Sequence, residues 1–186
     1  MPRHARDRLL ETAERLFYAE GLHAVGIERI LAESSVGRAS FYRHFPSKDD
    51  LIVAVLRCRD ERWRRWLDDA VTKRGGQPLA VFDALAERFD RDDFRGCAFI
   101  NTMVEIADGD HDAHRVAAEH KQKVLLLLRS LLADAGVTKP AELAKAFLLL
   151  MDGAIVTAIR ERKPGSAKAA KKIAASLLST YRLQEN

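Results

Sequence analysis

Apolar residues recur along this chain at intervals of three and four, which is the spacing of one face of an α-helix. The first stripe runs from Leu9 to Phe17 and is followed by Gly21, a residue type common just after a helix ends. Alternation with a period of two never persists for more than a few residues, which argues against strands. The pattern therefore predicts an all-α protein with about nine helices.

Breaks in the pattern set the expected helix bounds. Two short helices are expected over residues 27–34 and 38–44, and Pro46 ends the second because the residue before a proline favours extended backbone. Ser47 is a good N-cap for a long helix that begins at Lys48 and runs towards residue 71. The remaining helices are expected over residues 79–89, 96–107, 111–134, 140–162 and 167–183.

The lengths of these helices divide the chain near residue 46. The helices before this point are short, and those after it are long with broader apolar faces. We therefore expect a first domain over residues 1–46 and a second over residues 47–186.

Composition narrows the class of protein. The 186 residues are 47% hydrophobic and 31% charged, which is enough apolar material for a core and excludes a disordered chain. No apolar run approaches the roughly 20 residues of a membrane span, and the N-terminus has no apolar signal region. Two cysteines, Cys58 and Cys97, do not make a disulfide scaffold. A reduced, cytoplasmic protein is expected, with a mildly basic net charge of +4.

The two short helices have the organisation of a helix-turn-helix, in which the second helix lies in the DNA major groove. Val36 is the apolar residue of the turn, and Ile30, Phe41 and Phe45 are expected to hold the helices together. Residues 36–48 contain no acidic residue, which suits a polyanionic partner. The expected contacts with double-stranded DNA are made by Arg38, Ala39, Ser40, Tyr42, Arg43, His44 and Lys48.

These side chains differ in what they can recognise. Arg38 can donate to guanine edges, whereas Lys48 can reach a phosphate from the next helix. Tyr42, Arg43 and His44 can reach either bases or phosphates. Phosphate contacts fix the register of the protein on the duplex, while base contacts supply specificity.

The segment from Phe41 to Leu51, with the sequence FYRHFPSKDDL, resembles the signature of the TetR family of transcriptional regulators. In that family the recognition helix ends in an aromatic pair, followed by Phe, a short turn and a Lys that opens the fourth helix. The resemblance covers residues 7–52, and the rest of the chain is similar only in the number and length of its helices. It implies a DNA-binding regulator whose long helices form a ligand-sensing and dimerising domain. A repressor is expected, with an activator as the alternative.

Three positions depart from the family pattern. Ser35 stands where glycine is usual in the turn, so this turn must tolerate a side chain or use another backbone geometry. Gly37 replaces the usual Ser or Thr cap of the recognition helix. Gly26 stands where a Thr or Ser commonly touches phosphate, so that contact is not expected in this chain.

The last two helices are expected to join two copies of the chain. The helix around residues 148–155 is apolar nearly all round, so it is expected to face both its own core and a partner. Two helices per subunit, about 141–162 and 167–183, would form an isologous bundle. The resulting homodimer is expected to bind a near-palindromic operator. A monomer in which this helix is buried internally is the alternative.

A small, mostly apolar molecule is the expected effector, because pockets of helical bundles have apolar walls with few polar groups. Asn101 and Glu105 are four residues apart on one short helix, so both can point the same way. The alternative for every candidate is plain core packing or structural hydrogen bonding. The candidate ligand-contacting residues are Trp63, Trp66, Phe82, Phe89, Phe99, Asn101, Met103, Glu105, His120 and Met151.

Other chemistry has less support in the sequence. An enzyme is not expected, because there is no glycine-rich phosphate loop and no nucleophile elbow. No cofactor and no metal are expected, although His111 and His114 stand three apart with an acid between them. Helix capping is the alternative for this pair. Cys97, near a helix N-terminus, is a candidate redox thiol, with an inert free cysteine as the alternative.

Two rivals to a ligand-controlled regulator stay open. The basic end of the chain could belong to a protein-interaction module that meets an acidic partner, or the protein could bind DNA without any ligand. Arg3, His4 and Arg6 form a candidate arm that reaches the minor groove, with a solvated terminus as the alternative.

Overall fold

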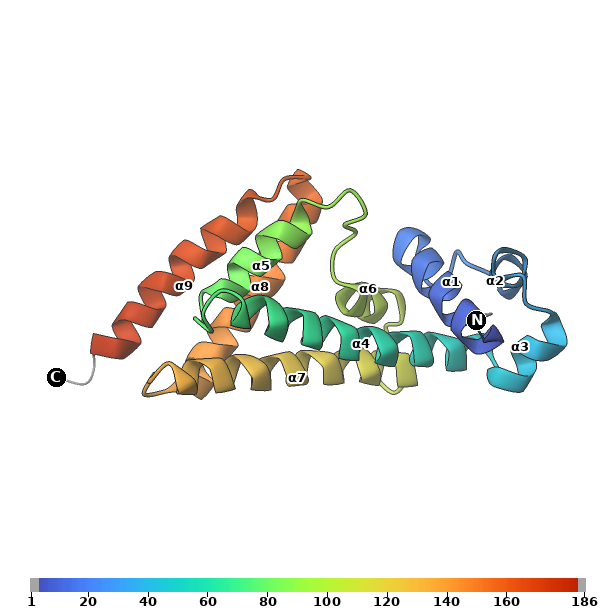
Figure 1. The fold of residues 1–186 in the computed structure, drawn as a ribbon, viewed down its shortest axis with the longest axis horizontal. Helices are drawn as coiled ribbons and strands as arrows, with labels where there is room; N and C mark the ends of the chain where they lie inside the picture. Colours follow the sequence, from blue (N-terminus) through green and yellow to red (C-terminus); the bar gives the residue numbers. More distant parts are fainter. Residues whose placement is uncertain (1–3, 184–186) are drawn as a thin grey trace. The chain divides into compact units, whose positions relative to one another are not determined.

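The computed structural model describes residues 4–183, and every regular element in that range is an α-helix (Figure 1). The prediction of an all-α fold is therefore confirmed. The described helices are α1 (Ala5–Glu20), α2 (Ile27–Ser34), α3 (Arg38–His44), α4 (Lys48–Thr72), α5 (Ala80–Phe89), α6 (Ala98–Glu105), α7 (Asp112–Asp134), α8 (Pro140–Glu161) and α9 (Gly165–Leu183).

Local sequence signals account for most of the helix ends. Helices α2 and α3 have the bounds that the pattern predicted. At the start of α4, the backbone N–H of Asp50 donates to Ser47 Oγ at 3.1 Å, which is the bond of an N-cap. Helix α6 is shorter than the predicted 96–107, because Gly96 has a φ of +88° and turns the chain before the helix begins.

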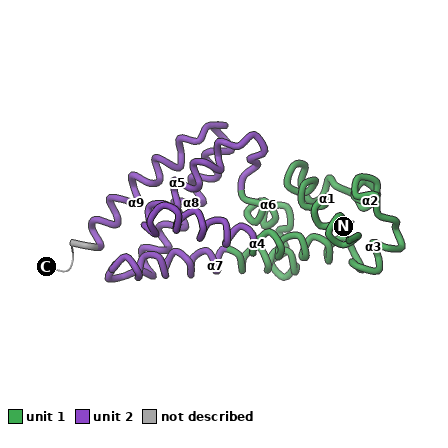
Figure 2. The backbone as a smooth tube through the Cα atoms, viewed as in Figure 1, with its two compact units in different colours: residues 1–61, 97–120 green, residues 62–96, 121–186 purple. Residues whose placement is uncertain are grey.

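The chain packs as two compact units, coloured separately in Figure 2. Unit 1 comprises residues 1–61 and 97–120, and unit 2 comprises residues 62–96 and 121–186. Helices α4 and α7 each contribute residues to both units. These two units differ from the two predicted domains, residues 1–46 and 47–186, because the units are defined by packing and the domains by function. The functional domains stay a prediction.

The core of unit 1 joins α1, α2 and α3 to the start of α4. Leu9 and Leu16 of α1, Ile30 of α2, Phe41 of α3 and Leu51 of α4 have no solvent exposure. Burying an apolar side chain of this size stabilises a fold by about 1.5–3 kcal/mol. These positions therefore hold the helix-turn-helix against α1 and α4.

A buried polar pair ties the rest of unit 1 together. His120 of α7 donates from Nδ1 to Asp60 Oδ1 of α4 at 2.7 Å, and both side chains are almost fully buried. The imidazole ring also stacks on Phe99 of α6, with 3.6 Å between ring centroids. A buried carboxylate without a partner is costly, so this pair stabilises the packing of α4, α6 and α7 in unit 1.

Unit 2 is built from α5, α8 and α9 with parts of α4 and α7. The rings of Phe82 on α5 and Phe147 on α8 lie 5.4 Å apart in its core. Lys171 Nζ of α9 forms an ion pair with Asp83 Oδ2 of α5 at 2.6 Å, and both side chains are partly exposed. None of the described helices combines the length with the apolar composition that crossing a bilayer requires.

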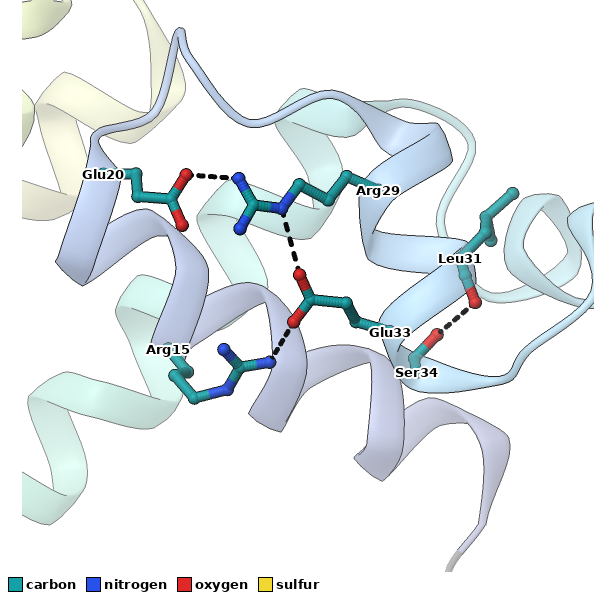
Figure 3. Close-up of polar contacts among 6 residues, drawn as sticks. All are labelled: Arg15, Glu20, Arg29, Leu31, Glu33 and Ser34. Carbon is teal, nitrogen blue, oxygen red and sulfur yellow. Dashed lines mark hydrogen bonds and ion pairs between the residues drawn. The ribbon is translucent and has the colours of Figure 1, made fainter.

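A chain of ion pairs joins α1 to α2 on the surface of unit 1 (Figure 3). Arg15 of α1 donates to Glu33 Oε2 of α2, and Arg29 Nε donates to the other carboxylate oxygen at 3.0 Å. Arg29 also donates a hydrogen bond to the carboxylate of Glu20, the last residue of α1. Two arginines therefore share one carboxylate, and their hydrogen bonds, chiefly that from Arg15, hold the pKa of Glu33 below its ordinary value.

We predict that the Glu33 carboxyl titrates below its ordinary pKa of 4.5 in a carbon-13 NMR titration of the folded protein. The stabilising effect of this carboxylate is present above its pKa in the unfolded chain and is lost as the pH falls through the lower folded-state pKa. Arg15→Gln should move the pKa of Glu33 back up, whereas Arg129→Gln, at an exposed position of α7, should not. A Glu33 pKa at or above 4.5 in the unsubstituted protein contradicts the network.

Candidate nucleic-acid interface

Two aromatic anchors set the orientation of α3. Phe41 is fully buried, Phe45 is nearly so, and their ring centroids lie 6.1 Å apart. Tyr42 meets the Phe41 ring edge-on at 5.1 Å while its own side chain stays 45% exposed. Because one face of this short helix is fixed in the core, the opposite face points to solvent.

The turn between α2 and α3 uses a left-handed residue that is not glycine. Ser35 has φ 53° and ψ 38°, so the turn keeps the geometry that favours glycine and tolerates a side chain there. The carbonyl of Ser35 accepts a hydrogen bond from Arg8 of α1 at 3.3 Å, which supports the turn from outside. Gly37 follows as the N-cap of α3 and makes no side-chain capping bond.

Most of the predicted DNA-contacting residues lie on the exposed face of α3. Ser40 is half-buried at the edge of this face. The face presents a planar cation, a phenol and an imidazole, groups that can donate to base edges or phosphates. Its exposed members are Arg38, Ala39, Tyr42, Arg43 and His44.

Arg38 has a partner that sequence reasoning missed. Its guanidinium bonds the carboxylate of Glu28 on α2, and both side chains are more than half exposed. An exposed pair of this kind contributes little to stability. It does reduce the positive charge that the face offers to a polyanion, so the predicted contact of Arg38 with DNA would require Arg38 to exchange this carboxylate for a phosphate or base.

Lys48 is half-buried and contacts the segment between α1 and α2. Its Nζ donates to the backbone carbonyl of Leu22 at 2.6 Å and lies 5.9 Å from the centre of the Phe17 ring. An ammonium group has three donors. The predicted phosphate contact would therefore use a donor that the Leu22 carbonyl leaves available.

The candidate N-terminal arm is only partly described. Arg3 lies outside the described residues, and His4 is an exposed residue at the N-cap of α1. The Arg6 guanidinium lies 5.7 Å from the centre of the Phe45 ring, directly after α3. Arg6 is therefore a residue of helix α1 rather than of an extended arm, and it lies beside the end of α3.

In unit 1, two of the predicted ligand residues line a small cavity. Asn101 and Glu105 of α6 border a space of about 30 Å³, which is large enough for one or two water molecules. Phe99 and His120 lie in the core, stacked on each other, and Met103 is half-buried. The cavity walls come from α1, α4 and α6, and its remaining lining residues are Glu14, Phe17, Tyr18, Leu22, Ile52, Val55, Leu56, Arg59, Ala98 and Thr102.

In unit 2, the predicted ligand residues lie in the core or beside it. Phe82, Phe89 and Met151 are buried. Trp63 and Trp66 are half-buried, with ring centroids 5.8 Å apart. Trp66 lines an open groove whose other residues are mostly charged: Arg62, Arg65, Asp69, Ala70, Lys73, Arg74 and Glu87.

The other candidate groups make structural contacts, among them one between His111 Nε2 and Asp49 Oδ2 of α4 at 3.6 Å. His111 Nδ1 accepts the backbone N–H of Ala113 at 3.1 Å, and His114 donates from Nδ1 to the carbonyl of Ile106 at 2.8 Å. Among the described residues, no three of His, Cys, Asp and Glu are grouped as metal ligands. Cys58 and Cys97 are both free and half-buried.

Comparisons with known proteins agree with this geometry. Residues 9–55, which cover most of α1, all of α2 and α3 and the start of α4, match the model of the family described as "Bacterial regulatory proteins, tetR family". Among solved structures, the chain is similar to SCO4454, a TetR-family transcriptional regulator from Streptomyces coelicolor. That likeness has a TM-score of 0.87, with 35% identity and 95% of each chain covered.

Two relatives extend the comparison. The chain is 30% identical over 172 residues to the transcriptional regulator AcuR of Cereibacter sphaeroides, which covers 86% of this chain and 78% of the relative. It is 27% identical over 115 residues to an uncharacterized HTH-type transcriptional regulator of Lactococcus lactis subsp. lactis. That second match spans 59% of either protein.

We predict that Glu28→Gln tightens binding to duplex DNA by about two- to fivefold at low salt, because it releases Arg38 from its counterion. The gain should shrink as salt rises, since an exposed ion pair is screened. Fluorescence anisotropy with a labelled duplex measures both effects. Glu119→Gln, an exposed position of α7, makes the same change in net charge and should have a smaller effect. Equal gains from the two variants contradict a specific role for Glu28.

Proposed function

The chain belongs to the TetR family of bacterial regulatory proteins, and from that premise we propose that it binds a near-palindromic DNA operator as a homodimer. We propose further that it represses transcription until a small, mostly apolar molecule releases it from the operator. The observation that carries DNA binding is the exposed basic and aromatic face of α3, held outward by the burial of Phe41. A helix presented in this way fits the width of the major groove.

Exposed apolar residues on α8 and α9 support the dimer. Leu149 is 74% exposed and Val156, two turns later on α8, is 53% exposed. Gly153 lies between them on the same face, with open space where a side chain would stand. Ile173 on α9, which packs against α8, is 52% exposed. A second copy of these two helices would cover this apolar surface in a four-helix bundle.

The cavity between α1, α4 and α6 supports a site for the effector. Its walls are mostly apolar, and its polar lining residues include Arg59, Asn101 and Glu105. Arg59 pairs with Glu14 at 2.9 Å and lies over the ring of Tyr18 at 4.1 Å. The space is too small for an organic effector in this conformation, so binding would require α6 to move away from α1 and α4.

Such a movement would link the effector to DNA. An effector that prefers a conformation unsuited to the operator weakens the affinity of the protein for the operator. By linkage, the operator weakens the affinity of the protein for the effector by the same factor, and the coupling free energy is typically about 1–3 kcal/mol. Because α6, α1 and the start of α4 belong to one packed unit, a change at the cavity would reach the helix-turn-helix without leaving that unit.

We predict that selection from random duplexes yields a near-palindrome whose half-sites lie about one helical turn, ~34–36 Å, or a multiple of it apart. Arg43→Ala and Tyr42→Ala should each weaken binding to that sequence by about tenfold or more, because they remove contacts on the α3 face. Arg129→Ala, which removes an exposed arginine from α7, is the matched control and should bind normally. Failure of the selection to enrich any sequence argues against the proposed function.

We predict that Leu149→Glu converts the dimer to a monomer in sedimentation equilibrium, because a carboxylate would be buried at the centre of the proposed bundle. The dissociation constant should rise by about a hundredfold or more. Leu126→Glu replaces a comparably exposed leucine of α7 and should leave the dimer intact. If the unsubstituted protein sediments as a monomer, or if both variants behave alike, the α8–α9 interface is wrong.

A further inference from the structure

The last residue of α6 holds the loop that follows α1. Glu105 Oε2 accepts the backbone N–H of Leu22 at 2.6 Å and that of His23 at 3.2 Å. These two amides follow the C-terminus of α1, where the chain leaves the helix and leads to α2. A charged acceptor makes stronger hydrogen bonds than a neutral one, so this carboxylate is an effective anchor for two adjacent peptides.

The same loop is held from two other directions. The Leu22 carbonyl accepts the bond from Lys48 Nζ at 2.6 Å, so both polar groups of this residue's backbone are fixed by side chains from other helices. His23 Nε2 donates to the backbone carbonyl of Glu105 at 2.9 Å. The Leu22 side chain is buried in the core of unit 1. The contacts together tie α6 and α4 to the segment between α1 and α2.

Gly21 allows the carboxylate to approach this closely. Its φ of +95° belongs to the region that favours glycine, and a Cβ at this position would stand 3.0 Å from Glu105 Oε2. The backbone geometry of the α1 terminus and the position of the Glu105 carboxylate therefore depend on each other.

We propose that Glu105 is a positioning residue that sets operator affinity by fixing the α1–α2 loop, and with it the placement of α2 and α3. This inference rests on the proposed function and adds how the helix-turn-helix is regulated. Glu105 and Leu22 both line the cavity between α1, α4 and α6. A molecule that enlarges this cavity separates the carboxylate from the two amides, and the loop loses its anchor.

The test compares operator affinity among three variants of the full chain. Glu105→Ala removes the acceptor and should weaken binding to the selected operator by about tenfold. Glu105→Gln keeps one neutral acceptor oxygen and should restore part of that loss. Val104→Ala changes the neighbouring residue of α6, whose side chain is 75% exposed, and should bind like the unsubstituted protein. Circular dichroism at the assay temperature checks that each variant is folded.

Hydrogen exchange separates positioning from local stabilisation. In Glu105→Ala the Leu22 and His23 amides should exchange about tenfold faster, while protection of the α3 amides is retained. If these amides open and operator affinity stays within about twofold of the Val104→Ala value, Glu105 has a local structural role and the inference is overturned. If the unsubstituted protein selects no DNA sequence, the proposed function fails and this inference fails with it.

Discussion

Burial of Phe41 is the constraint on which the exposed basic and aromatic face of α3 depends. A helix of seven residues has no stability of its own, so tertiary contacts must decide whether α3 forms and how it is turned. With Phe41 and Phe45 in the core, the basic and aromatic residues of α3 are left on the solvent side. The Ser35 turn before α3 has a left-handed backbone that is unfavourable for serine, and it is supported by the bond from Arg8 and by the burial of Val36.

Polar contacts then determine how the helix-turn-helix is attached to its surroundings. Glu33 bonds two arginines across α1 and α2, and the Leu22 peptide is bonded on one side by Glu105 and on the other by Lys48. Deeper in unit 1, the His120–Asp60 pair brings α7 and α4 together. A regulator needs an attachment that is firm enough to present α3 and weak enough to change, and hydrogen bonds at the edge of a core meet both requirements.

Local pattern was sufficient for the presence of the helices and for which side chains of α3 are exposed, whereas their contacts with DNA stay a prediction. The apolar spacing predicted α2 and α3 at their observed bounds, and Ser47 was predicted as the cap that the structure shows. The shortening of α6 was missed because the positive φ of Gly96 is not visible in an apolar stripe. The hydrogen bond from Lys48 to the Leu22 carbonyl was also missed, since a side chain's direction depends on what lies beside it; a phosphate contact of Lys48 stays a prediction.

The sequence by itself determined which segments are helical, where the helix-turn-helix lies and which residue types its second helix exposes, because these properties depend on neighbours three and four positions away. The tertiary structure alone decided that Glu105 meets Leu22, 83 residues earlier in the chain, and that Arg38 meets Glu28. It also decided that Asn101 and Glu105 border a cavity with α1 and α4. No local pattern encodes such contacts, since they exist only once the path of the whole chain has brought distant side chains within hydrogen-bonding distance.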